Sequence, residues 1–238
     1  MKALILNSGM GSRMGDLTKN QPKCMTTIFG EETILSRQLK ILSECGISEI
    51  IITTGYYDEV LMDYVKSINI NTDVTFVKNN KYTETNYIYS IYCAKDYLED
   101  DILLMHGDLV FDENVLEGIL KLKGSAMTVS TTLPLPDKDF KAVLAKRDNT
   151  VFIDKVGIEF FDNAVSAQAL YKLNQDEWKL WLDKIILFCE SGKTGCYAEN
   201  ALNEVTDKCV VEPFDCQNLL CCEIDNIDDL EAVRSKLI

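Results

Sequence analysis

Residues 2–25 read KALILNSGMGSRMGDLTKNQPKCM, a short apolar stretch followed by a loop that contains glycine. Lys2–Leu6 has the aliphatic run of a buried strand. Gly9 and Gly11 follow it at once, and glycines at such a place let backbone N–H groups approach an anion closely. The dinucleotide pattern GxGxxG is broken because Met14 stands where the third glycine belongs, and no GK[ST] closes a P-loop. Taken alone, the stretch predicts either an anion-binding loop or a plain tight turn.

Outward from this loop, strand-like and helix-like stretches alternate along the chain. Their spacing predicts strands over 2–6, 49–54, 73–77, 101–106, 125–131, 143–146, 151–156, 165–172, 208–213 and 219–224. It predicts helices over 33–45, 58–67, 86–98, 112–122, 176–190, 197–205 and 227–237. We therefore expect an α/β fold in one domain, 1–238, with a mainly parallel sheet covered by helices on both faces. The short strands after Pro136 predict a small antiparallel extension, and ligands are expected at the carboxyl ends of the parallel strands.

The loop continues into Pro22-Lys23, so that residues 6–23 read L-N-S-G-x-G-S-R-M-x-x-L-T-x-x-x-P-K. This segment resembles the signature of nucleotidyltransferases that couple a nucleoside triphosphate to a phosphorylated small molecule. That family includes sugar-1-phosphate nucleotidyltransferases and bacterial phosphocholine cytidylyltransferases. The resemblance implies a Rossmann-like nucleotidyltransferase fold. It also implies that the loop wraps the nucleotide and that its basic residues contact the phosphates as catalytic groups. These roles fall on Gly9, Gly11, Ser12, Arg13 and Lys23.

The chain departs from the family pattern at three positions of the loop. Asn7 and Ser8 replace the usual pair of alanines, and Asp16 replaces a common proline. None of the three removes a proposed phosphate contact. We expect Asn7 and Ser8 to line the nucleotide site and to alter contacts with the base or the ribose.

Two aspartates are candidates for a metal site. Asp108 follows the strand-like run Leu103–His106, and the family places a magnesium ligand at this position. Asp225 comes just before the last helix and resembles the second family ligand. Mg²⁺ prefers oxygen ligands, so two carboxylates and triphosphate oxygens would suffice. The alternative is that Asp108 starts a turn and Asp225 caps a helix. We read His106 as a strand residue rather than a ligand.

The segment 81–92, KYTETNYIYSIY, bears on the choice of nucleotide. Sugar-activating members typically carry a Gln-Pro-x-Gly-Thr-Ala-like stretch in this region, which is missing here. The pattern Tyr82-x-x-x-Asn86-x-x-x-Ser90 instead resembles phosphocholine and phosphonate cytidylyltransferases. This resemblance favours CTP, with Asn86 and Ser90 in the nucleotide site. The alternative is an amphipathic helix that Asn86 caps and whose tyrosines are core residues.

Three residues are candidates for contact with the acceptor. Tyr197 supplies one aromatic face for a cationic headgroup, but Ala198 stands where the phosphocholine branch has a Trp. Glu199 is a candidate to bind a primary ammonium, and Lys141 is a candidate to face the acceptor and favour an anion. The alternative for Lys141 is a solvated surface lysine. Phosphocholine, 2-aminoethylphosphonate and a related anionic compound therefore all remain open as acceptors.

The charge distribution excludes several classes of partner. The chain has 24 basic and 38 acidic residues, a net charge of −14, which argues against nucleic acid and anionic membranes as partners. Residues 1–24 carry four bases against Asp16, a net +3, which leaves 20 bases and 37 acids, a net −17, in the rest. No stretch is apolar over the roughly 20 residues of a membrane span, and the N-terminus predicts no signal peptide. We expect a cytoplasmic protein, and a homodimer only by weak analogy with the family.

The nine cysteines include no CxxC pair, which predicts reduced thiols rather than disulfides or a zinc site. The expected function is Mg²⁺-dependent transfer of CMP from CTP to a small phosphoryl or phosphonyl acceptor, with release of pyrophosphate. The alternatives are a sugar-1-phosphate uridylyl- or thymidylyltransferase and a non-catalytic nucleotide sensor.

Overall fold

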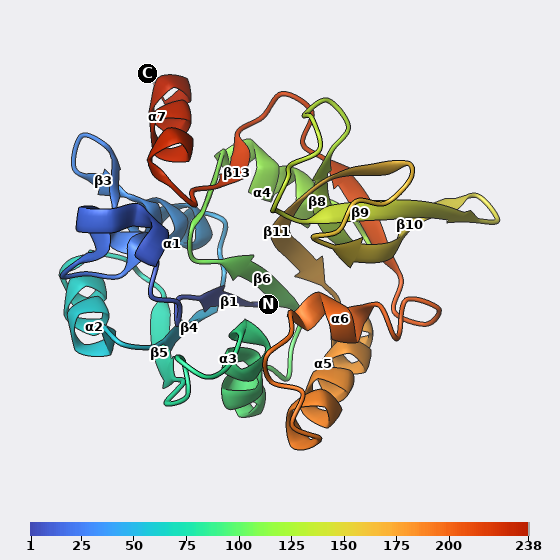
Figure 1. Ribbon diagram of the computed structural model, residues 1–238, viewed down its shortest axis with the longest axis horizontal. Helices are drawn as coiled ribbons and strands as arrows, with labels where there is room; N and C mark the ends of the chain where they lie inside the picture. Colours follow the sequence, from blue (N-terminus) through green and yellow to red (C-terminus); the bar gives the residue numbers. More distant parts are fainter. Residues whose placement is uncertain (238) are drawn as a thin grey trace.

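One twisted sheet runs through the protein, which we describe from a computed structural model that covers residues 1–237 (Figure 1). Its strand order is β10-β9-β11-β6-β1-β4-β5, with β8 pairing to β11 and β12 to β8. The strands of this sheet are β1 (Lys2–Leu6), β4 (Glu49–Thr54), β5 (Asp73–Lys78), β6 (Ile102–His106), β8 (Ser125–Ser130), β9 (Lys141–Arg147), β10 (Thr150–Gly157), β11 (Ala164–Leu173) and β12 (Val211–Asp215).

The helices lie on both faces of the sheet (Figure 1). They are α1 (Ile34–Glu44), α2 (Asp58–Ser67), α3 (Tyr87–Ala94), α4 (Glu113–Leu120), α5 (Gln175–Glu190), α6 (Ala198–Leu202) and α7 (Ile227–Lys236). On one face α3, α5 and α6 pack in one apolar cluster with the sheet, and on the other α1, α2 and α4 pack in a second. The predicted α/β architecture is confirmed.

The parallel part of the sheet explains why its strands read as continuous apolar runs. Leu4 of β1 lies between Ile51 of β4 and Leu104 of β6, and all three side chains are buried because helices cover both faces. Parallel strands that end together bring the segments after β1 and β6 to one edge of the sheet. The loop after Leu6 and the turn after His106 therefore meet.

The predicted antiparallel extension is also confirmed. β11 runs antiparallel to β6, β8 and β9, and β9 forms a hairpin with β10. α5 closes this side with an apolar stripe. Its Trp178 and Trp181 are buried and donate from their indole nitrogens to the carbonyl oxygens of Leu98 and Ala198, at 3.0 and 2.8 Å.

Several short elements were not predicted, and some predicted ones were too long. The loop after β1 contains 3₁₀ turns over Ser12–Thr18 and Lys23–Met25, β2 (Thr27–Phe29) pairs with β3 (Glu32–Thr33), and β7 (Leu109–Phe111) pairs with β13 (Cys221–Glu223). α3 ends at Ala94, where a 3₁₀ turn replaces the predicted helix end. α6 ends at Leu202 because the Asn203 amide bonds both backbone groups of Val156, at 2.8 and 2.7 Å.

Within residues 1–237, no helix is long and apolar enough to span a bilayer.

Candidate active site

Three adjoining hollows open at the carboxyl ends of β1, β5 and β6. The loop hollow, about 300 Å³, lies between residues 7–24 and the carboxylates of Asp108 and Asp225. The α3 hollow, about 500 Å³, lies between Ser8-Gly9 and the start of α3. The aromatic hollow, about 510 Å³, lies among Tyr87, His106, Phe140 and Tyr197. Asp108 lines all three hollows, so a group held at Asp108 is within reach of ligands in each.

Lys23 is the cation at the centre of the loop hollow. Its ammonium contacts Asp108 and lies 2.9 Å from Asp225 Oδ1. Burial alone would lower the pKa of Lys23, but the two carboxylates outweigh burial and raise it. Arg13 also pairs with Asp225, at 2.9 Å, with its guanidinium largely exposed at the mouth of the hollow. The structure therefore brings four predicted residues together, although they lie up to 212 positions apart in the chain.

The loop glycines make this arrangement possible. Gly11 has a positive φ of 61°, and a Cβ there would lie 2.8 Å from Lys23 Cβ. A side chain at position 11 would therefore push Lys23 away from its carboxylates. Gly9 and Ser12 line the same hollow, as predicted from the signature. Asn7 and Ser8 are both buried, Asn7 facing the loop hollow and Ser8 the α3 hollow.

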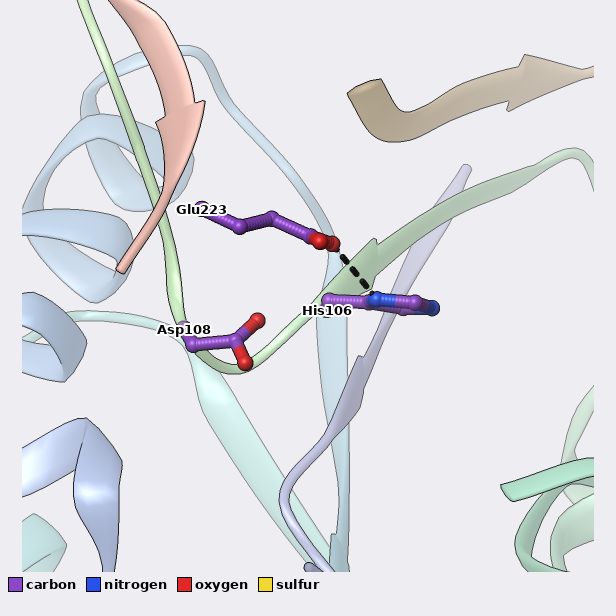
Figure 2. A group of neighbouring side chains, drawn as sticks. All are labelled: His106, Asp108 and Glu223. Carbon is purple, nitrogen blue, oxygen red and sulfur yellow. Dashed lines mark ion pairs between the residues drawn. The ribbon is translucent and has the colours of Figure 1, made fainter. Parts of the chain in front are cut away.

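On the other side of Asp108 stand His106 and Glu223 (Figure 2). His106 ends β6, Asp108 follows in the turn, and Glu223 comes from β13. One potential ligand atom from each lies within 4.8 Å of the other two, and His106 Nδ1 is 2.6 Å from Glu223 Oε1. Burial alone would lower the pKa of His106, but Glu223 outweighs it and raises the pKa to about 9.

Two arrangements of ligands for a cation are thus available around Asp108. The predicted pair, Asp108 and Asp225, is bridged by the Lys23 ammonium. The group His106, Asp108 and Glu223 offers one nitrogen and two carboxylates. Asp108 Oδ1 is buried and accepts no hydrogen bond from residues 1–237. A buried carboxylate oxygen without a partner fits a hard divalent cation, so the donor set agrees with Mg²⁺.

The α3 hollow has a polar floor. Asn86 caps α3 through its side chain, which accepts from Tyr87 N at 2.7 Å, and it also lines the hollow. Ser90 is buried one turn further on and accepts from Asn79 Nδ2 at 3.1 Å. Both predicted residues therefore face this hollow, and the predicted capping role of Asn86 holds as well. Asn79, which orients Ser90, was not predicted, because a lone Asn after a strand carries no distinctive signal.

The aromatic hollow is walled by four rings in mutual contact. The centroids of Tyr87 and His106 are 4.7 Å apart, those of Tyr87 and Tyr197 5.8 Å, those of His106 and Phe140 6.2 Å, and those of Phe140 and Tyr197 5.3 Å. Five carboxylates also line the hollow: Asp108, Asp137, Asp139, Glu223 and Asp225. Its lysine and arginine side chains are Arg13 and Lys138. Aromatic faces with an excess of carboxylates suit a cationic headgroup.

Comparison with known proteins agrees with this geometry. Residues 3–137, more than half of the chain, match the model of the MobA-like NTP transferase domain. The chain belongs to this family. The NTP transferase match spans the loop hollow and the α3 hollow except for Asp225 and Gly195. It covers only part of the aromatic hollow, whose residues from Lys138 onward lie outside the match.

Curated relatives of this NTP transferase chain include cytidylyltransferases and bifunctional GlmU proteins. It is 33% identical over 129 residues to the CTP:phosphoglutamine cytidylyltransferase of Campylobacter jejuni, which is 52% of this chain and 49% of that protein. It is 28% identical over 180 residues to the CMP-5'-(3-aminopropyl)phosphonate synthase of Streptomyces rubellomurinus, 74% of this chain and 28% of that protein. The chain thus spans about half or less of the length of these relatives.

Solved structures share the NTP transferase fold over the whole chain. The CTP:phosphocholine cytidylyltransferase of Streptococcus pneumoniae superposes with a TM-score of 0.74 at 22% identity, over 100% of this chain and 99% of that one. A UDP-glucose pyrophosphorylase superposes equally well, with a TM-score of 0.77 at 13% identity over 99% of this chain and 97% of that one. At these identities the likeness establishes the fold alone.

Two predicted acceptor contacts of the NTP transferase chain need correction. Lys141 is fully buried and does not line the aromatic hollow, because its ammonium donates to the carbonyl oxygens of Asp139 and Ile158 at 3.0 and 2.8 Å. It is neither an acceptor contact nor the solvated surface lysine of the alternative. Glu199 is 1% exposed and lies behind the hollow, where it accepts hydrogen bonds from the hydroxyls of Tyr87 and Tyr171. Tyr197 does line the hollow, as predicted.

Sequence reasoning also missed two residues on the walls of the hollows. Glu223 stands two residues before Asp225, and that spacing on a strand places both side chains on the same face. The sequence therefore contained a signal for placing Glu223 beside Asp225. Phe140 carried no local signal, since its place beside Tyr197 depends on the pairing of β9 with β11.

The structure bears on the cysteines too. All nine are free thiols, and the metal-ligand group found within residues 1–237 contains none of them. The thiols of Cys24 and Cys221 are buried. Burial raises the pKa of Cys24, and a hydrogen bond with Cys216 together with burial raises the pKa of Cys221, as for inert core residues.

Proposed function

We propose that this protein is a cytidylyltransferase that transfers CMP from CTP to a small phosphoryl or phosphonyl acceptor and releases pyrophosphate. The observation that carries this proposal is the position of Asp108 at the junction of three hollows. One hollow holds Lys23 and Arg13, which are paired with Asp108 and Asp225 and can bind phosphates when these carboxylates hold a metal ion; one is polar, and one is aromatic and acidic. These chemistries match a triphosphate, a nucleoside and a cationic acceptor in turn.

The roles in the loop hollow follow from charge. Attack on the α-phosphorus places negative charge on the departing pyrophosphate, which preorganised cations stabilise. Lys23 is fixed between two carboxylates and Arg13 is free to turn toward phosphates at the mouth. Asp108 and Asp225 would hold Mg²⁺ when the nucleotide enters. The metal would supply additional positive charge at the triphosphate, with Lys23 turning from the carboxylates to phosphate oxygens.

The reaction needs no covalent enzyme intermediate. A phosphoryl oxygen of the acceptor attacks the α-phosphorus of CTP and forms a new P–O bond. The bond between the α-phosphorus and the oxygen that bridges to the β-phosphorus breaks, and pyrophosphate leaves with that electron pair. The acceptor in the aromatic hollow and the nucleotide in the loop and α3 hollows approach Asp108 from different sides, which suits an in-line displacement.

CTP is favoured over other nucleotides by two independent observations. The segment Tyr82–Ser90, which resembles cytidylyltransferases, places Asn86 and Ser90 in the α3 hollow. Two curated relatives act with cytidine nucleotides by their names, a CTP-dependent cytidylyltransferase and a CMP-phosphonate synthase.

The acceptor is proposed to carry an amine as well as the phosphoryl or phosphonyl group. The rings of Tyr87, Phe140 and Tyr197 and an excess of carboxylates line the aromatic hollow. The charge of Lys141, which suggested an anionic acceptor, is engaged by the carbonyl oxygens of Asp139 and Ile158. Aminoalkyl phosphates and phosphonates therefore fit better than purely anionic compounds.

A pyrophosphate-release assay tests the proposal. The purified protein with Mg²⁺ is incubated with each of CTP, UTP, dTTP, ATP and GTP. Acceptors are phosphocholine, phosphoethanolamine, 2-aminoethylphosphonate, glycerol phosphate, an anionic phosphonate and glucose-1-phosphate. We expect release with CTP and an amine-bearing acceptor. Release with UTP or dTTP and glucose-1-phosphate would instead establish the sugar-activating alternative. Nucleotide binding without release in any combination would identify a sensor.

A further inference from the structure

Two consecutive side chains at the floor of the site are buried without a hydrogen-bond partner. Asn7 is 8% exposed and Ser8 is 6% exposed, and neither Asn7 Nδ2 nor Ser8 Oγ has a partner within residues 1–237. Buried polar groups in native proteins are almost always hydrogen-bonded, so an unpartnered one beside a hollow points to a ligand atom. The two face different hollows, Asn7 the loop hollow and Ser8 the α3 hollow.

The backbone of Asn7 is held in place although its side-chain amide nitrogen has no hydrogen-bond partner within residues 1–237. Its backbone N–H donates to Thr53 through both the carbonyl and the hydroxyl oxygen, at 3.2 Å each. Its Oδ1 lies against Gly107, where an added Cβ would be only 1.7 Å away. The amide is thus locked beside the turn that carries Asp108, and only glycine at position 107 leaves room for it.

The position of Asn7 selects the part of the nucleotide that it can reach. Leu6, Gly9 and Asp108 line both the loop hollow and the α3 hollow, so a nucleotide that fills both crosses this shared rim. Asn7 itself lines only the loop hollow, but it follows Leu6 in the chain and its side chain lies against Gly107, which precedes Asp108, so its amide is next to this rim. With the nucleoside in the α3 hollow and the outer phosphates near Lys23 and Arg13, the group at the rim is the α-phosphate. An amide nitrogen can only donate, so its partner must be an acceptor oxygen.

We propose that Asn7 Nδ2 donates a hydrogen bond to a non-bridging oxygen of the α-phosphoryl group, the group that is attacked. This inference rests on the proposed function and adds a catalytic residue to it. A neutral donor suits this place because it stabilises charge on the equatorial oxygens without competing for the carboxylates of Asp108 and Asp225. Ser8, one residue on, faces the nucleoside and serves as the internal contrast.

The test compares ligands that differ only in their phosphates. Binding of cytidine, CMP and CTP is measured by displacement of a fluorescent CTP analogue from wild type, Asn7→Ala, Ser8→Ala and Asn71→Ala. Asn71 is an exposed asparagine before β5 and serves as the matched control. We expect Asn7→Ala to weaken CMP and CTP about tenfold, to leave cytidine unchanged, and to lower turnover about 10- to 100-fold. Ser8→Ala should weaken the binding of all three ligands by the same factor, and Asn71→Ala should leave the binding of all three unchanged.

A second variant tests the proposal even if Asn7→Ala does not fold. Gly107→Ala keeps the Asn7 amide but displaces it, so it should reproduce the selective loss for CMP and CTP. Thermal unfolding of each variant shows whether it is folded. Equal weakening of cytidine and CMP by Asn7→Ala, or turnover equal to that of Asn71→Ala, would overturn the proposal.

Failure of the proposed function gives a different result. A wild type that binds cytidine nucleotides but releases no pyrophosphate with any acceptor refutes the transferase. The binding series then still decides whether Asn7 contacts the α-phosphate. A wild type that binds none of the three ligands overturns both.

Discussion

Lys23, which is partly buried, and Lys141, which is fully buried, lie close to the same site, yet their ammonium groups have opposite surroundings. Lys23 contacts two carboxylates that themselves line the loop hollow. Lys141 donates to two backbone carbonyls behind the wall of the aromatic hollow. The first lysine can exchange its partners for a ligand that brings its own charge, whereas the second fixes the backbone around it. The difference teaches that the partners of a buried charge, rather than its distance from the site, decide whether it does chemistry or supports the fold.

The same contrast separates the two sides of the site. On the nucleotide side, Asn7 Nδ2 and Ser8 Oγ have no hydrogen-bond partner within residues 1–237, and the guanidinium of Arg13 is largely exposed. On the acceptor side, Lys141 and Glu199 have all their charge engaged by the protein itself. Substitutions on the nucleotide side should therefore act on turnover, and those of Lys141 and Glu199 on stability or on the positions of other residues.

The largest effect is expected at Lys23. Lys23→Ala should lower turnover by about 10²- to 10³-fold, because it removes one preorganised donor to the developing phosphate charge. Initial rates of pyrophosphate release at saturating CTP measure the effect. Lys19→Ala, which removes an exposed lysine from the same loop, is the matched control and should keep normal turnover. A Lys23→Ala protein that is folded and nearly as active as the control would remove Lys23 from the mechanism.

The next effect is expected at Glu199. Glu199→Gln should raise the KM for the acceptor about tenfold and leave the KM for CTP unchanged. The reason is that the hydroxyls of Tyr87 and Tyr171 lose a charged acceptor, and Tyr87 then moves in the wall of the aromatic hollow. Kinetics with 2-aminoethylphosphonate and with a phosphonate that lacks the amine measure the effect. The amine-bearing acceptor should be impaired more, because the Tyr87 ring is one of the faces proposed for the ammonium. An unchanged KM for 2-aminoethylphosphonate would contradict the positioning role of Glu199.

Much of this molecule was predictable from local patterns, and the exceptions share one cause. β1, β4 and α2 were predicted with their observed bounds. The spacing of apolar residues within each of these segments is enough to identify it as a strand or a helix. The loop residues come together in one hollow because a long signature fixes their spacing, and their contacts with a nucleotide stay a prediction. Lys141 and Glu199 were misplaced because their partners come from β10, α3 and β11, and no local pattern reports such contacts. β7 was missed for the same reason, since its three residues depend on pairing with β13.

A smaller and purely structural effect is expected at Lys141. Lys141→Met should lower the free energy of unfolding by about 1–3 kcal/mol, because the carbonyl oxygens of Asp139 and Ile158 lose their donor while they stay partly buried. Urea unfolding measures the change. The ratio of kcat/KM for amine-bearing to amine-free acceptors should stay the same. A shift of that ratio toward amine-bearing acceptors would mean that the Lys141 charge reaches the acceptor after all.

The smallest effect is expected at Asp137, on the exposed rim of the aromatic hollow. Asp137→Asn should raise the KM for an amine-bearing acceptor about two- to fivefold, since one exposed charge contributes only a fraction of a kcal/mol to about 1 kcal/mol. The rise should shrink as salt is added, because exposed charges are screened over roughly 10 Å at 0.1 M. An amine-free phosphonate should be bound no worse, because the lost carboxylate repels it. Asp162→Asn removes an exposed acid outside the hollow and controls for net charge. If both variants shift the KM equally, the rim attracts the amine only through the overall charge of the protein, and recognition lies with the four rings.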